Sequence, residues 1–184
     1  MAVLMIAGSG RGAGKTAVGC ALIAAMPELQ WAAVKVSPHE HEIAPGAWEE
    51  VDRGSEKDTG RYLRAGAQRA FLVTASEDAA GDVVRVRKMA SECDSILMET
   101  NRESADLIFN DERMIRLAVL AGSPRDWKAS LPGAAERADV LILTTGLFAD
   151  GLPAVLRRKR IFIFPMGAWT SPELIHFVRG KLMA

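Results

Sequence analysis

A glycine-rich segment near the amino terminus ends in a lysine and a threonine, and its residue types suit the binding of phosphate. It reads Gly8-Ser9-Gly10-Arg11-Gly12-Ala13-Gly14-Lys15-Thr16. Small residues let successive backbone N–H groups turn inward around phosphate oxygens, and a helix that begins near Gly14 points its N–H groups and positive dipole end at them. In such a loop Lys15 contacts the β- and γ-phosphates and the Thr16 hydroxyl ligates magnesium. We therefore predict a phosphate-binding loop (P-loop) in which residues 9 to 16 hold a nucleoside triphosphate with Mg²⁺.

Two positions of this loop depart from the usual pattern G-x-x-x-x-G-K-T. The first glycine of that pattern falls on Ser9, with Gly8 one place earlier, and serine is small enough to serve there. Arg11 lies inside the turn, where it either neutralises phosphate charge or is an ordinary exposed arginine. Apolar residues 3–6 predict a strand before the loop, and alanine-rich residues predict a helix after it. This context favours a P-loop over a chance Gly-Lys-Thr.

An acidic residue closes another apolar run, as expected for the magnesium side of such a site. Ile96, Leu97 and Met98 are followed by Glu99, where a parallel strand would meet the ligand crevice. Many strands end in an acid, but beside a P-loop this one is predicted to hold magnesium directly or through water. Asn101 either assists or begins the following turn.

A second group of polar residues follows the strand predicted at 31–37. Lys35 ends this apolar strand near the predicted crevice, which suits contact with a phosphate or a substrate anion. His39 and His41 face the same side of an extended segment, but two histidines alone make a poor zinc site. We predict that Lys35, His39 and His41 contact the nucleotide or a substrate; an ordinary polar loop is the alternative.

The order of these motifs resembles the molybdopterin-guanine dinucleotide biosynthesis protein B (MobB) family over residues 1 to about 110. The P-loop is followed by a strand ending in Lys35 with His39 and His41, then by Lys57-Asp58-Thr59 with Leu63-Arg64-Ala65-Gly66-Ala67, then by the strand ending in Glu99. In the family the glutamate is commonly followed by glycine, whereas Thr100-Asn101 follows here. The likeness is therefore to a divergent member.

The resemblance implies a GTP-binding protein with weak hydrolytic activity, often dimeric, that assists the enzyme attaching GMP to molybdopterin. Asp58 would then be a magnesium- or water-side carboxylate near the γ-phosphate, and Arg64 a phosphate or structural contact. The expected catalytic residues are Lys15, Asp58 and Glu99, and the expected metal ligands are Thr16, Asp58 and Glu99. Leu143-Thr144-Thr145-Gly146 stands where a guanine-reading Asn-Lys-x-Asp would be expected, so GTP is preferred to ATP only through the resemblance.

A looser likeness to dethiobiotin-synthetase-like ATPases leaves other functions open. Their P-loop has a glycine six positions before the Gly-Lys-Thr glycine, as Gly8 stands to Gly14 here. The chain would then be an ATP-dependent small-molecule kinase or ligase, with Lys35, His39 and His41 holding the acceptor. A nucleotide-switched adaptor, in which Pro38–Gly54 changes order with the γ-phosphate, is the non-enzymatic alternative.

The elements that must position these residues form an alternating pattern. Continuous apolar runs predict strands at 3–6, 31–37, 70–74, 96–99, 115–120, 140–144 and 161–164, and helical segments are predicted at 14–26, 58–64, 78–91, 132–138 and 172–183. Apolar runs of this kind are typical of parallel strands covered on both faces. We expect one α/β P-loop domain over residues 1–184, with about seven mainly parallel strands and helices on both faces. Pro38–Gly54 is predicted to be a loop over the site or plain surface.

Composition restricts the partners that we expect. The 23 basic and 23 acidic side chains cancel, which removes the electrostatic argument for nucleic acid. No apolar run approaches the length of a membrane span, so no membrane association is expected. Cys20 and Cys93 lie far apart and read as reduced thiols of a cytoplasmic protein.

Overall fold

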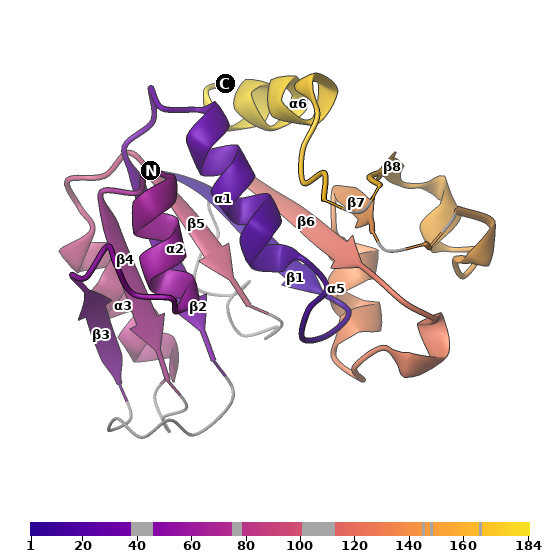
Figure 1. Cartoon of the computed structure of the whole chain (residues 1–184), viewed down its shortest axis with the longest axis horizontal. Coiled ribbons are helices and arrows are strands. Elements are labelled where there is room, and N and C mark those ends of the chain that lie inside the picture. The colour runs from indigo at the N-terminus through magenta and orange to yellow at the C-terminus, as the bar shows by residue number, and fades with distance from the viewer. Residues whose placement is uncertain (38–45, 75–78, 101–112, 145, 148, 166) are drawn as a thin grey trace.

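The alternating pattern folds into one mixed sheet covered by helices on both faces (Figure 1). The computed structural model describes residues 1–37, 46–74, 79–100, 113–144, 146–147, 149–165 and 167–184. Its strands are β1 (Ala2–Gly8), β2 (Trp31–Val36), β3 (Ala47–Glu50), β4 (Arg69–Val73), β5 (Ser95–Glu99), β6 (Met114–Leu120), β7 (Val140–Leu143) and β8 (Arg160–Ile163). Its helices are α1 (Lys15–Ala25), α2 (Asp58–Ala65), α3 (Ala79–Met89), α5 (Leu131–Arg137) and α6 (Pro172–Leu182), with 3₁₀ turns at Pro124–Asp126, Ala149–Gly151 and Leu156–Arg158.

The sheet order is β3-β4-β2-β5-β1-β6-β7-β8, and every pairing except β3 with β4 is parallel. β1, which leads into the P-loop, lies between β5 and β6. The register pairs Ile6 with Glu99 on one side, and Lys35 of β2 with Glu99 on the other. Because parallel strands end at the same edge, the P-loop, Lys35 and Glu99 come together there.

The predicted α/β class and the predicted elements are confirmed, but the strand count is wrong by one. About seven strands were expected, and the sheet has eight in the described residues. The additional strand is β3, which lies inside the segment predicted as a loop and pairs antiparallel with β4 at the sheet edge. Its sequence Ala-Trp-Glu-Glu has no continuous apolar run. Across the pair, Nε and Nη2 of Arg69 on β4 donate to Oε1 and Oε2 of Glu49 on β3, each at 2.6 Å. Pairing with the open edge of β4, and not its own pattern, makes this segment a strand.

Two layers of helices complete the core. On one face α1, α2 and α6 pack against inward side chains such as Leu117 and Val119, and on the other face α3 and α5 pack in two further clusters (Figure 1). Ala118 and Leu120, the alternate residues of β6, belong to the α5 side. Both faces of each central strand are therefore buried, which explains the continuous apolar runs in the sequence.

Helix ends follow the expected capping signals where the sequence carries them. The Ser171 side chain accepts a hydrogen bond from the Leu174 N–H at 3.3 Å, with Pro172 next in the chain, so α6 begins as predicted. Gly66 caps the end of α2. The N–H groups of Gly66 and Ala67 donate to the carbonyls of Leu63 and Tyr62 at 3.2 and 3.1 Å. Among the described helices, none has the length and apolar character needed to span a membrane.

Candidate functional site

The P-loop joins the end of β1 to the start of α1, as the sequence predicts. Gly14 precedes α1 with φ of +99°, a left-handed conformation that disfavours any residue with a Cβ. The ring of Trp169 lies against it, so that a Cβ on Gly14 would be 2.4 Å from Trp169 Cζ3. Lys15 Nζ donates to the Gly10 carbonyl at 2.9 Å, which folds the lysine over its own loop. The Lys15 ammonium is thus held beside the backbone of the loop.

Ser9 holds this loop against the end of β6 by hydrogen bonds. Its Oγ accepts a hydrogen bond from the Ala121 N–H at 2.9 Å and lies 3.1 Å from the Ala121 carbonyl, to which it donates. The Ser9 carbonyl accepts from the Lys128 N–H at 3.2 Å. A glycine at this position would lack the side-chain bonds to the end of β6. The departure from the usual first glycine therefore has a physical reason that the sequence alone did not show.

On its opposite side, the loop is hydrogen-bonded to the residue that follows β7. Thr144, just after β7, is 3% exposed and donates its hydroxyl proton to the Ala13 carbonyl at 3.1 Å. No motif in the sequence predicted Thr144 or Trp169 as part of the site. Only their positions could have indicated a place in the site, since Thr144 follows a strand at the same sheet edge and Trp169 follows β8 by a few residues.

Glu99 is the centre of a buried polar group beside the loop. It is 3% exposed, and its Oε2 accepts from the Thr16 hydroxyl at 2.8 Å and from the Tyr62 hydroxyl at 2.7 Å. Its Oε1 accepts from Lys35 Nζ at 2.9 Å and lies 3.9 Å from Lys15 Nζ. One carboxylate therefore contacts the P-loop helix, β2 and α2.

Asp58 lies at the first position of α2 and shares Lys35 with Glu99. Lys35 Nζ donates to Asp58 Oδ2 as well as to Glu99. Arg61, one turn along α2, lies 3.3 Å from Asp58 Oδ1. Two carboxylates and two lysines are thus gathered at the carboxyl edge of the sheet, next to the Thr16 hydroxyl.

The surroundings shift the pKa values of these groups. Burial lowers the pKa of Lys15 although Glu99 opposes that effect. Burial also disfavours the charge on Lys35, but the carboxylates of Glu99 and Asp58 outweigh it and raise the pKa of Lys35. Burial would raise the pKa of Asp58, yet the Lys35 ammonium bonded to it holds that pKa below its usual 3.8. Lys35 and Asp58 are therefore charged at neutral pH.

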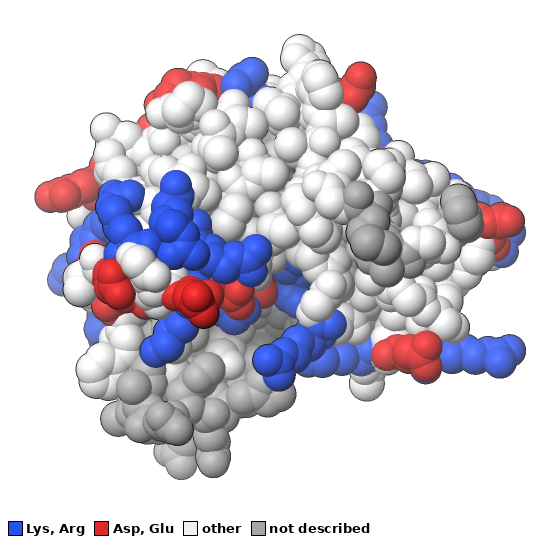
Figure 2. All heavy atoms as spheres, in the orientation of Figure 1, with Lys and Arg blue, Asp and Glu red and all other residues white. Residues whose placement is uncertain are grey.

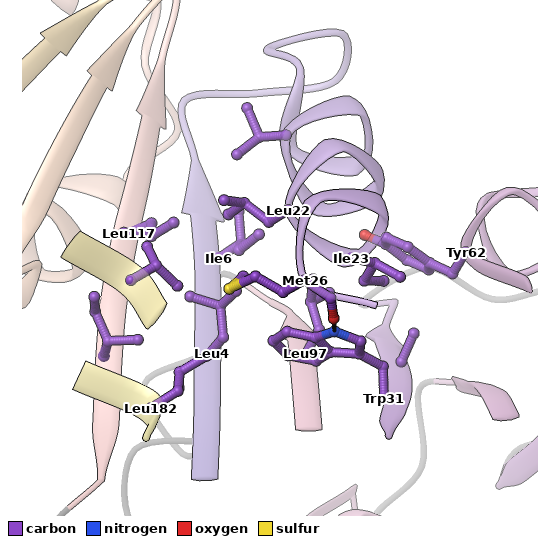
Figure 3. Close-up of a cluster of buried hydrophobic side chains, with 14 of the residues drawn as sticks. Leu4, Ile6, Leu22, Ile23, Met26, Trp31, Tyr62, Leu97, Leu117 and Leu182 are labelled. Atoms are coloured by element: carbon purple, nitrogen blue, oxygen red, sulfur yellow. Dashed lines mark hydrogen bonds between the residues drawn. The ribbon is translucent and has the colours of Figure 1, made fainter. Parts of the chain in front are cut away.

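Tyr62 was not expected in the site and is one of its best-packed members. It is fully buried, and its ring extends from α2 toward α1 beside Ile23, with the hydroxyl facing α1 (Figure 3). Burial and the neighbouring Glu99 raise the pKa of Tyr62 well above 10, so its hydroxyl remains a donor. No pattern in the sequence predicted this place for Tyr62.

Of the other predicted residues, Arg11 and Arg64 lie in the described part of the chain and three do not. Arg11 is exposed on the loop, and Arg64 is a structural contact, because its Nη1 donates to the carbonyls of Arg53 and Ser55 at 2.8 and 2.7 Å. Basic and acidic side chains lie next to each other over the part of the surface where α2 and β3 are found (Figure 2). His39, His41 and Asn101 lie outside the described residues.

The donor chemistry suits a magnesium ion that arrives with phosphates. Hydroxyl and carboxylate oxygens of Thr16, Asp58 and Glu99 are hard ligands of the kind that Mg²⁺ prefers. Within the described part of the chain, no group of three or more His, Cys, Asp or Glu side chains is placed to hold a metal ion by itself. Mg²⁺ usually binds through one or two carboxylates plus substrate phosphates, so the set fits that use.

Comparison with known proteins gives the fold. No protein-family model matches the chain, and no curated protein matches it. The hydrogenase maturation factor HypB from Archaeoglobus fulgidus is 20% identical, with a TM-score of 0.67 over 99% of this chain and 90% of that one. HypB from Helicobacter pylori, solved in complex with nickel, is 15% identical, with a TM-score of 0.55 over 100% and 86%.

A third solved structure extends the likeness to a larger protein. LpxK from Aquifex aeolicus, solved in complex with ATP, is 16% identical, with a TM-score of 0.55 over 89% of this chain and 53% of that chain. At such identities the likeness is one of fold alone. The chain shares the α/β fold of these solved structures, and the glycine-rich loop at residues 8–16 is a feature of its own sequence.

Proposed function

We propose that this chain binds a nucleoside triphosphate with Mg²⁺ at its P-loop and hydrolyses it slowly. The observation that carries the proposal is the bond between the Thr16 hydroxyl and Glu99 at 2.8 Å, with the Lys15 ammonium 3.9 Å from the same carboxylate. The loop lysine, the magnesium-binding hydroxyl and the acid at the end of the neighbouring strand thus form one group. Each is a residue type that phosphoryl-transfer sites require.

The chain's residues would act mainly by positioning and charge. Lys15 and the loop N–H groups stabilise negative charge on the β- and γ-phosphates, and Thr16 and Glu99 hold the metal side. Mg²⁺, when bound with the nucleotide, neutralises charge on the phosphates. Asp58, on the α2 side of Glu99, would orient water or the metal. Catalysis of this kind needs no covalent intermediate with the protein.

The nucleotide and the biological output rest on the motif order. In the proposed function the nucleotide is GTP, and the chain is a dimeric accessory protein that acts with the enzyme attaching GMP to molybdopterin. The support is the sequence of Lys35, Lys57-Asp58-Thr59 and Glu99 around the P-loop, which resembles the MobB family. ATP is the alternative nucleotide, because Leu143-Thr144-Thr145-Gly146 stands where a guanine-reading Asn-Lys-x-Asp would be expected.

A second candidate function is favoured by the place of Lys35. Its ammonium is paired with both carboxylates, and 24% of the side chain is exposed. An ammonium there can hold an anionic acceptor near the γ-phosphate, as a small-molecule kinase or ligase requires. Formation of nucleoside diphosphate that is stimulated well above the basal rate by one metabolite would favour this candidate over slow hydrolysis.

Titration calorimetry with non-hydrolysable GTP and ATP analogues and Mg²⁺ tests the main proposal. Lys15→Ala is expected to weaken binding by about tenfold to a hundredfold, because each hydrogen bond to a charged group contributes about 1.5–3 kcal/mol. Lys181→Ala, at an exposed lysine near the end of α6, is the matched control and should bind as the parent does. Equal affinity of the parent and Lys15→Ala would overturn the proposal, and removal of divalent metal should abolish hydrolysis.

A further inference from the structure

Lys35 lies at the point where the two predicted metal-binding carboxylates converge. Its Nζ is 2.9 Å from Glu99 Oε1 and is also bonded to Asp58 Oδ2. The register of β2 and β5 pairs Lys35 directly with Glu99, and Asp58 begins α2. A single ammonium therefore bridges two acids from different elements, beside the Thr16 hydroxyl that bonds to Glu99.

An ammonium in this position competes with a metal ion for the same oxygens. Both are cations, and close like charges repel, most strongly at a site such as this one where Glu99 is 3% exposed. A divalent cation that binds Asp58 and Glu99 must therefore displace two charge-assisted hydrogen bonds of Lys35. Lys15 competes less, because its Nζ is farther from Glu99, at 3.9 Å, and donates to Gly10.

We propose that Lys35 is a built-in cation that excludes divalent metal from Asp58 and Glu99 until a triphosphate is bound. The γ-phosphate then attracts the Lys35 ammonium and frees the carboxylates, so metal enters only with the nucleotide. This inference rests on the proposed function and adds an order of binding to it.

The proposal is tested without nucleotide, by titrating the protein with Mn²⁺ and following the signal of free Mn²⁺ by electron paramagnetic resonance. The parent protein is expected to bind little Mn²⁺. Lys35→Met keeps the aliphatic stem and removes the charge, and it should raise Mn²⁺ affinity by at least about tenfold, because the metal no longer competes with the ammonium. Lys35→Gln is the second variant, in case Lys35→Met does not fold.

Three controls assign the effect to charge at this site. Lys35→Arg keeps a cation and should gain no Mn²⁺ affinity, and Lys181→Met removes a distant charge with the same expected result. Adding Asp58→Asn to Lys35→Met should abolish the gain. The melting temperature, followed by circular dichroism, should rise with Mn²⁺ in Lys35→Met and not in the parent.

Two outcomes would overturn the proposal. One is Mn²⁺ binding by the nucleotide-free parent as tight as that by Lys35→Met, and the other is no gain in either folded charge-removing variant. Failure of the proposed function is a separate result, because it is measured as the parent's affinity for nucleotide. A parent that binds triphosphate but shows either outcome keeps the proposed function and loses the ordered entry of metal.

Discussion

The P-loop glycines differ in backbone conformation and in the space around them, so alanine substitutions should lower the free energy of unfolding by different amounts. Gly12 has φ of +77° with nothing within 4 Å of an added Cβ, whereas Gly14 has φ of +99° with Trp169 Cζ3 only 2.4 Å away. A left-handed conformation costs an L-residue about 1–2 kcal/mol. Overpacking against a neighbour adds about 1–3 kcal/mol. Gly12→Ala therefore meets backbone strain alone, and Gly14→Ala meets both.

The difference between these two variants is the sharper quantity. Replacing glycine also stabilises the protein by restricting the unfolded chain, but that contribution is common to both and cancels. Ordinary contact begins at 3.4 Å, so the Trp169 ring must retreat by 1.0 Å from a Cβ that would lie at 2.4 Å. We expect Gly14→Ala to be less stable than Gly12→Ala by about 1–3 kcal/mol. For a chain of this length, that corresponds to a melting temperature lower by about 2–12 °C.

Urea unfolding followed by circular dichroism measures these free energies without relying on tryptophan fluorescence. The deciding variant is Gly14→Ala combined with Trp169→Ala, compared with Trp169→Ala alone. With the ring removed, the cost of Gly14→Ala should fall to that of Gly12→Ala. Gly10→Ala has no left-handed φ and nothing within 4 Å, so it should be neutral within about 0.5 kcal/mol. Equal costs at positions 12 and 14, or an excess at 14 that persists without Trp169, would refute the reasoning.

Three further predictions concern side chains around the loop. Tyr62→Phe removes a bond to a buried carboxylate that is worth about 1.5–3 kcal/mol; Thr16 still donates to the same oxygen, so we expect a loss near the lower end in urea unfolding, and an unchanged midpoint would contradict the bond. Ser9→Gly restores the usual loop glycine but leaves the Ala121 N–H without its 2.9 Å partner. It should lower stability by about 1–3 kcal/mol without improving nucleotide affinity in calorimetry. Tighter nucleotide binding at unchanged stability would contradict this role of Ser9. Because the native pKa of Asp58 lies below its usual 3.8, this carboxylate stabilises the fold above that pH, and the contribution is lost as pH falls through the native pKa. The stability difference between the parent and Asp58→Asn should therefore shrink toward zero in acid, and a difference that is constant with pH would exclude this linkage.

Local sequence determined the elements and the loop chemistry. Continuous apolar runs predicted each buried parallel strand, since residues covered on both faces need no alternation. Gly-Lys-Thr after such a run predicted the P-loop, and Ser171-Pro172 predicted the start of α6. Glu99 was predicted because it ends an apolar strand, where parallel topology places residues at one edge. Asp58 was predicted only through the resemblance of Lys57-Asp58-Thr59 to the MobB family.

Tertiary structure decided which side chains meet and what each does there. The edge strand β3 forms because β4 offers an open edge, and no pattern in Ala47–Glu50 announces it. Arg64 donates to the backbone carbonyls of Arg53 and Ser55, and Ser9 bonds to Ala121, a residue 112 positions away. Such pairings depend on the order of strands in the sheet, which local residue types do not encode. The same is true of Lys35, whose bridge between Asp58 and Glu99 exists only because β2, β5 and α2 converge.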